Sequence, residues 1–130
     1  MTPPARTPRI EATLLHFLRA CFPGVHFGSL RDKGNPPLEC VLAGEPQGMA
    51  TPVSQYVRLR LSVIARREDG TGDFAKAQRL ASGIIRTITS QGCITPIVSA
   101  QLDAGPMRLA DGDAYPIYCY AVLLLQVGVA

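Results

Sequence analysis

The last segment of the sequence, residues 117–129, is apolar on both of the faces that a β-strand would present. Successive side chains of a strand point to opposite sides, so alternate positions form two faces. One face comprises Ile117, Cys119, Ala121, Leu123, Leu125 and Val127. The other comprises Tyr118, Tyr120, Val122, Leu124 and Gln126. A solvated face of an antiparallel sheet should be polar, so we expect the second face to be covered by a further layer of the chain or by another subunit.

Two amphipathic helices are predicted upstream of this strand. Residues 8–21 carry apolar side chains at helical spacing, and Thr7 precedes them as an N-cap. Residues 74–89 form a second apolar stripe, which begins after the predicted N-cap Asp73. Gly83 in the interior of this helix costs about 1 kcal/mol relative to Ala, and therefore indicates close packing at that position.

The remaining segments predict strands separated by turns and two longer connections. The predicted strands are residues 25–27, 38–42, 56–66, 97–103 and 117–129. Residues 43–54 contain two Pro and two Gly, which are unfavourable in a central strand, and are predicted as a loop. Residues 104–116 are predicted as a hairpin-like excursion.

These elements predict one α+β domain over residues 1–130, with residues 1–6 as a flexible tail. Its sheet is mixed, mostly antiparallel and four- to five-stranded, with two helices packed on one face. Helices about 10 Å wide match four strands spaced by about 4.8 Å, so two helices cover one face only. The opposite apolar face then needs a partner, so we expect the chain to form an oligomer. Alternatively, the helices cover opposite faces, or Tyr118 and Tyr120 are half exposed.

The chemistry-bearing residues do not form a recognisable catalytic motif. His16 and His26 have no nucleophile motif beside them, and a Cys21–His26 pair would need a third orienting group. Asp111 and Asp113 are predicted to lie in a solvated turn, because a calcium loop needs more oxygen ligands at set intervals. Neither catalytic residues, nor a cofactor, nor a metal ion are therefore expected.

Cysteine content and charge narrow the class of protein further. The four cysteines have no metal-ligand spacing and are predicted to be buried small hydrophobic residues, namely Cys21, Cys40, Cys93 and Cys119. A secretory signal and an apolar run long enough to span a membrane are both lacking. A net charge of +3 with only two Lys predicts nonspecific contact with DNA at most.

Arg58 and Arg60 lie two residues apart on the polar face of the strand predicted over residues 56–66. Like charges at this spacing repel each other, so a compensating anion is favourable. Three interpretations remain open. The arginines could make the face soluble, pair with acidic residues of a neighbouring subunit, or line a lumen through which DNA passes.

Three stretches, which together span residues 9–127, resemble the tail-terminator proteins of siphophages, especially those of actinobacterial phages and prophages. The first is the opening helix followed by LECVLAGE. The second is YVRLRLSVIAR with the helix of EDGTGDFAKAQRLASGIIRTI, and the third is AQLDAGPMRLADGDAYPIYCYAVLLLQV. The family's third strand often carries an early Asp and a late Trp, and this chain has neither.

The resemblance implies a structural virion protein rather than an enzyme. Such a protein forms a hexameric ring that caps the tail tube, stops its polymerisation and binds the head-completion protein. It is located in the virion, and in the host cytoplasm during assembly. The predicted subunit interface comprises Tyr118, Tyr120, Val122, Leu124, Arg58 and Arg60. The predicted loops facing the tube or the connector contain Gly48, Met49, Thr51, Arg108, Asp111 and Asp113.

Two other functions remain open at this point. The chain could be a head–tail connector or stopper subunit, which would bind the portal side rather than the tube. It could also be a small nucleic-acid-binding module, in which Tyr118 and Tyr120 stack on bases.

Overall fold

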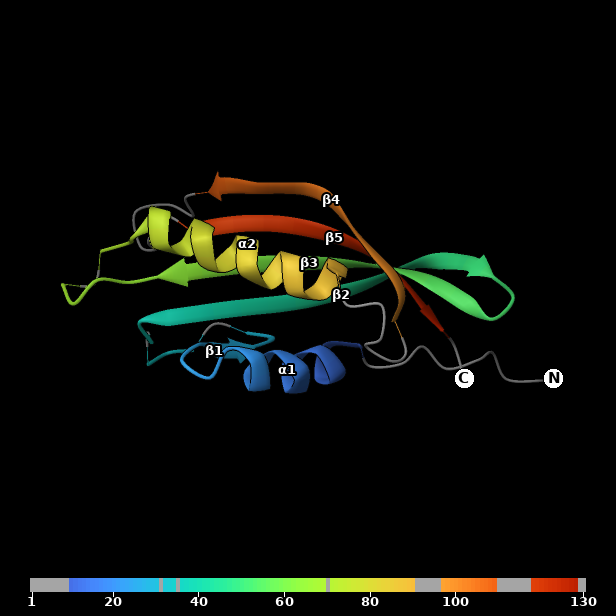
Figure 1. The fold of residues 1–130 in the computed structure, drawn as a ribbon, viewed down its shortest axis with the longest axis horizontal. Coiled ribbons are helices and arrows are strands. Elements are labelled where there is room, and N and C mark those ends of the chain that lie inside the picture. Colours follow the sequence, from blue (N-terminus) through green and yellow to red (C-terminus); the bar gives the residue numbers. More distant parts are fainter. Residues whose placement is uncertain are drawn as a thin grey trace.

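The computed structural model describes residues 10–30, 32–34, 36–69, 71–90, 97–109 and 118–128, with the side chain of residue 50 excepted. The helices are α1 (Ile10–Cys21) and α2 (Phe74–Ser90). The strands are β1 (His26–Gly28), β2 (Leu38–Thr51), β3 (Ser54–Ala65), β4 (Ile97–Leu109) and β5 (Tyr118–Gly128). Figure 1 shows the long strands running side by side, with both helices lying along them.

The strands form one five-stranded sheet in the order β1-β2-β3-β5-β4. Only the short β1 pairs in parallel, with β2, and every other neighbouring pair is antiparallel. The predicted α+β class, with a mixed and mostly antiparallel sheet, is therefore confirmed.

Both helices pack against the same face of the sheet. The core contains the inward residues of α1 (Ile10, Leu14, Leu18) and of α2 (Ala77, Ala81, Ile84, Ile85, Ile88). These residues form one cluster with alternate residues of the strands, among them Leu42, Leu59, Leu61, Leu123 and Leu125. Since alternate residues share one face, the helices form a single layer and the sheet has one face without a described helix.

The helix boundaries follow local signals in the sequence. The Asp73 carboxylate accepts a hydrogen bond from the backbone N–H of Lys76 at 3.2 Å, so the predicted N-cap of α2 is confirmed. At the start of α1, Glu11 accepts a hydrogen bond from the backbone N–H of Gly44 at 3.0 Å and thereby joins the helix to β2. The predicted N-cap Thr7 lies outside the described residues.

The prediction of a loop over residues 43–54 is wrong, because β2 continues to Thr51 and forms a long hairpin with β3. The hairpin projects beyond the helices on the right of Figure 1. β1 pairs only with residues 39–41, so in the described part of the chain no strand lies beside the outer edge of β2 beyond them. Proline is tolerated at sheet edges and bulges. Pro46 lies at a register shift on this edge, next to Gly48, whose φ is +125°.

The prediction of an excursion from residue 104 is wrong for residues 104–109, because β4 extends to Leu109. The rest of the predicted excursion, residues 110–116, lies outside the described residues. A register shift between Ala104 and Met107 absorbs the irregular residues. Gly105 has a φ of +84°, and a Cβ atom there would lie 2.5 Å from the Tyr120 carbonyl oxygen. The strand can continue through this segment because a glycine, which has no Cβ, occupies a position where the backbones approach closely.

Two further predictions are wrong in detail. A Cβ atom on Gly83 would lie 3.8 Å from the Phe22 ring, which is ordinary contact, so Gly83 is not required by close packing. Cys21, the last residue of α1, is exposed and not buried as predicted. Cys40 and Cys119 are buried as predicted, and Cys93 lies outside the described residues.

A buried ion pair lies at the end of the sheet opposite the hairpin. Glu39 is fully buried, and its Oε1 lies 3.1 Å from Nη1 of Arg66. The same arginine nitrogen donates a hydrogen bond to the Pro36 carbonyl at 2.7 Å. Glu39 Oε1 is therefore paired with the positive charge of Arg66 but accepts no hydrogen bond. Its other oxygen accepts one from the backbone N–H of Asp32 at 2.6 Å. The pair therefore fixes the connection between β1 and β2.

We predict that Gly83→Ala raises the free energy of unfolding by about 1 kcal/mol, because alanine favours the helical backbone and the added methyl group fits. The measurement is urea denaturation followed by circular dichroism. Gly105→Ala is the matched control and should destabilise by more than about 1 kcal/mol, because the methyl group meets backbone atoms at positive φ. Equal effects of the two variants would contradict this.

We predict that Arg66→Met lowers the free energy of unfolding by about 3 kcal/mol, because it leaves the buried Glu39 carboxylate without a counter-charge. Arg60→Met is the control. It removes an ion pair whose side chains are nearly half exposed and should change stability by less than about 1 kcal/mol. Chemical denaturation of both variants measures the difference, and a loss from Arg66→Met no larger than the control would contradict this assignment.

Candidate interaction surface

The face of the sheet that lacks a described helix, here called the open face, brings together the residues predicted as a subunit interface. Tyr118, Tyr120, Val122 and Leu124 share one side of β5, because they are alternate residues. On β3, Arg58 pairs with Leu124 and Arg60 pairs with Val122. The six predicted residues thus form a continuous surface, although whether a subunit binds there stays a prediction.

Side chains on the open face of β5 are less buried than those on the helix-covered face. Leu123 and Leu125 have no exposed surface, whereas Tyr118, Tyr120 and Leu124 are each half-buried. Val122, in the middle of the strand, retains 8% exposure. Neighbouring strands shield these side chains laterally, and no described helix covers them. The apolar area that remains is available to a partner.

Two ion pairs cross the open face. Arg60 Nη1 lies 3.1 Å from Glu45 Oε1, and Arg58 Nη2 lies 3.8 Å from Asp103 Oδ2. All four side chains are nearly half exposed, so each pair contributes about 1 kcal/mol or less. The anions that the two arginines need are therefore supplied within the chain, from β2 on one side and β4 on the other.

The large apolar side chains that are exposed in the described residues gather in two separate places, apart from Leu30. One group lies on the β2–β3 hairpin and comprises Met49, Val53 and Tyr56. The other lies along β4 and comprises Val98, Leu102 and Met107. Of these residues the sequence indicated only Met49, because their exposure follows from the sheet order and not from local periodicity.

The residues predicted to face a tube or connector are not all together. Gly48, Met49 and Thr51 lie at the end of the hairpin. Arg108 lies on β4, with its guanidinium carbon 5.8 Å from the centre of the Phe74 ring, which places it on the helix side of the sheet. Asp111 and Asp113 lie outside the described residues.

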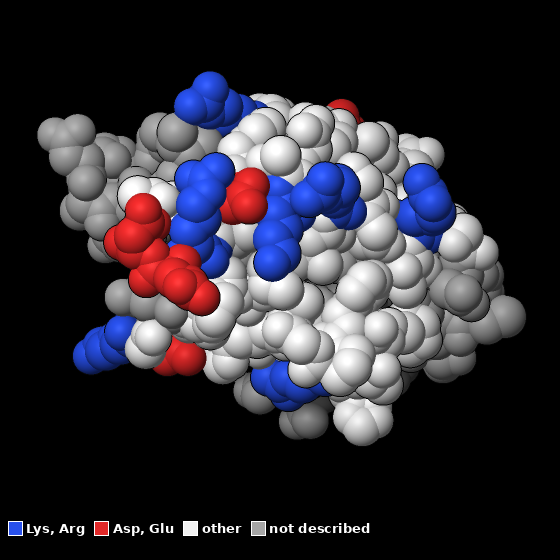
Figure 2. Space-filling view, turned by 60° about the vertical axis from the view of Figure 1, so that its left-hand side comes forward, with Lys and Arg blue, Asp and Glu red and all other residues white. Residues whose placement is uncertain are grey.

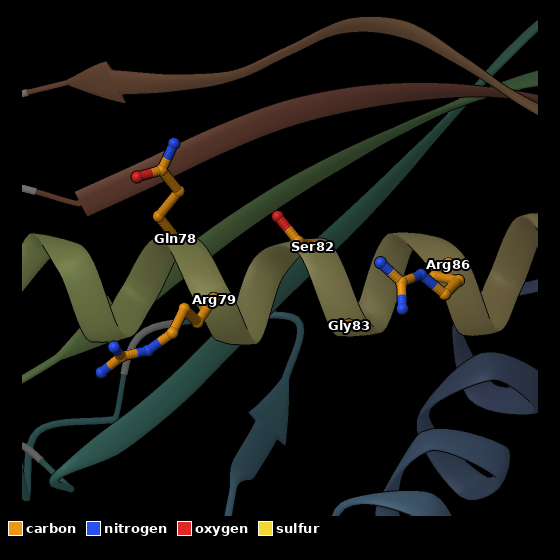
Figure 3. A pocket seen from close by; sticks show the side chains of 5 residues that line it. All are labelled: Gln78, Arg79, Ser82, Gly83 and Arg86. Carbon is orange, nitrogen blue, oxygen red and sulfur yellow. The ribbon is translucent and has the colours of Figure 1, made fainter.

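The outer surface of α2 is basic. It exposes Lys76, Arg79 and Arg86, and the helix contains no acidic residue. Figure 2 shows Lys and Arg side chains spread over one face of the molecule, with Asp and Glu gathered at one end. A shallow hollow is lined by Gln78, Arg79, Ser82, Gly83 and Arg86 (Figure 3). All of its lining comes from this one helix, and its two guanidinium groups would attract phosphates or carboxylates without selecting among them.

The buried thiols are poor nucleophiles. Burial raises the pKa of Cys40, with a smaller contribution from the charge of Glu39, and burial also raises the pKa of Cys119. Both thiols are therefore protonated at neutral pH, and the thiolate is the reactive form. His26, the first residue of β1, places its Nε2 3.6 Å from Oδ2 of Asp32, but both side chains are exposed. Among the described residues, no three or more His, Cys, Asp or Glu side chains gather where they could hold a metal ion.

No protein-family model and no curated protein matches this chain. Neither described helix has the length and apolar character needed to cross a membrane. The surfaces from which a function can be argued are the open face, the two groups of exposed apolar side chains and the basic surface of α2.

We predict that Leu124→Asn lowers the free energy of unfolding by about 1 kcal/mol, because Leu124 is half exposed on the open face. Leu123→Asn, one residue away, should cost about 3 kcal/mol or more, because it buries an amide in the core. Denaturation of both variants under conditions that keep the protein monomeric tests whether the two faces differ. Similar losses would show that the open face is as enclosed as the core.

Proposed function

We propose that this protein is a structural subunit of a phage tail, a tail terminator. In this role it forms a ring that caps the tail tube, stops the polymerisation of the tube and provides the surface to which the head attaches. The observation that carries the proposal is the open face, where Tyr118, Tyr120 and Leu124 are only half-buried and both described helices lie on the other side of the sheet.

The distribution of apolar surface supports assembly in a ring. Closed rings require a heterologous contact, in which one patch of a subunit meets a different patch of its neighbour. The open face, the hairpin end with Met49 and Val53, and the start of β4 with Val98 are different patches on one small domain. Tyr56 and Met107 lie opposite Gln126 and Tyr120 and so belong to the open face. A terminator also needs separate surfaces for the tube and for the head-completion protein, and these patches would provide them.

The experiment is electron microscopy of the purified protein alone and together with the tube protein encoded beside it. We expect rings, and tubes that end at a defined length with a ring at one end. Leu124→Asn should fold but cap tubes less efficiently, because it places an amide on the surface that assembly buries. Tubes of uncontrolled length in the presence of the wild-type protein would contradict the proposal.

The same preparations separate the alternatives. Rings that co-purify with the portal protein and do not bind tubes would identify a head–tail connector or stopper instead. Tight binding of single-stranded DNA with a steep dependence on salt, without rings, would identify a nucleic-acid-binding module. The basic surface of α2, with Lys76, Arg79 and Arg86, is the observation that favours this last candidate.

A further inference from the structure

The outer edge of β4 is poorly protected along its first half. Among the described residues β4 pairs only with β5, so no described strand lies on its other side. Residues 97–102 (IVSAQL) contain neither a charge nor a proline, and Val98 and Leu102 are 61% and 44% exposed. Edge strands normally carry charges, prolines or bulges that prevent pairing with another chain. In β4 a register shift already lies between Ile97 and Ser99, but charges and prolines begin only at Asp103 and Pro106.

The opposite edge of the sheet is protected except at the end of the hairpin. β1 covers residues 39–41 of β2, and the Glu11 carboxylate binds the backbone N–H of Gly44. Pro46, which has no N–H, follows. Beyond it, residues 47–51 (QGMAT) have no charge and no proline, although register shifts lie at Pro46/Gly48 and Met49/Thr51. Among the described residues this segment pairs on one side only, with β3. Met49 in this segment is 58% exposed.

The two unprotected segments lie at the same end of the sheet. Met49 pairs with Gln55, Gln55 with Val127, and Val127 with Ile97, so residues 49 and 97 occupy one row across the sheet. Three successive antiparallel pairings separate β2 from β4, which therefore run in opposite directions. In a neighbour related by rotation about an axis along the strands, β2 keeps its direction. It consequently meets β4 of the first copy in the antiparallel sense.

We propose that two copies of this chain join head to tail by edge pairing, in which residues 47–51 of one copy add as an antiparallel strand to residues 97–102 of the next. Strand addition satisfies the free backbone groups of both edges. It also removes Met49 and Val53 of one copy and Val98 and Leu102 of the other from water. The inference rests on the proposed self-assembly and names the segments that carry it, a contact separate from the open face.

Site-directed cross-linking tests the contact. The variant Met49→Cys/Val98→Cys, with Cys21 and Cys93 replaced by Ser, is treated with a short bismaleimide and separated on a denaturing gel. A head-to-tail contact gives a ladder of dimer, trimer and higher species, because every copy carries both halves of the contact. A mixture of the two single variants should stop at the dimer, and each single variant alone should remain monomeric.

Each outcome decides the proposal. The ladder, together with the dimer limit in the mixture, supports it. Monomer only, or a dimer from either single variant alone, overturns it. Rings in electron micrographs without the ladder overturn the edge contact and leave the terminator proposal standing. A ladder without rings or capped tubes supports the edge contact and counts against the terminator.

Charge substitutions provide an independent measurement. Met49→Lys and Val98→Lys should each weaken self-association by about tenfold or more in sedimentation velocity, because each places an ammonium group in an apolar contact. Leu30→Lys is the matched control, since Leu30 is 80% exposed and belongs to neither segment. It should leave the association unchanged. Equal association of all three variants with the wild type would overturn the proposal.

Discussion

The structure depends on the packing of both described helices against the same face of the sheet. Four strands of 11 to 14 residues present two broad faces, and the two described helices pack together on one of them. On that face Leu59, Leu61 and Leu123 lose all contact with water, and this burial supplies most of the hydrophobic stabilisation. On the other face Ile64 and the ion pair of Glu39 with Arg66 are buried at one end, whereas the ion pairs of Arg58 and Arg60 are nearly half exposed and contribute little. The domain is therefore stabilised from one side and open to partners from the other.

Local signals in the sequence were sufficient for the helices and for the class of fold. The apolar stripe of α2 and its N-cap Asp73 are determined within one or two turns of the chain, and both predictions hold in the structure. Arg58 and Arg60 were also correctly assigned to one face of β3, because strict alternation fixes the side of each residue.

The extents of β2 and β4 could not be predicted, because they depend on sheet order. A proline argues against a central strand, but Pro46 lies where β2 has no outer neighbour. Gly105 resembles a loop residue, although its lack of a Cβ is what lets β4 pass close to Tyr120. The exposure of Val98 and Val53 was likewise not predictable, since it arises where the strand is at an edge or a tip. The sequence thus predicted which residues share the open face, but not which apolar side chains are exposed at the edges of the sheet.

The hydrogen bond from the Gly44 amide to Glu11 has a consequence for the behaviour of the chain before it meets any partner. A free strand edge can recruit further chains without limit, as in the growth of fibrils. The Glu11 carboxylate accepts a hydrogen bond from one of the backbone N–H groups through which β2 would bind another chain. A Cβ atom at Gly44 would lie only 2.8 Å from that carboxylate. Docking of the first helix therefore also acts as a safeguard against runaway aggregation, and a chain with α1 detached would lose it.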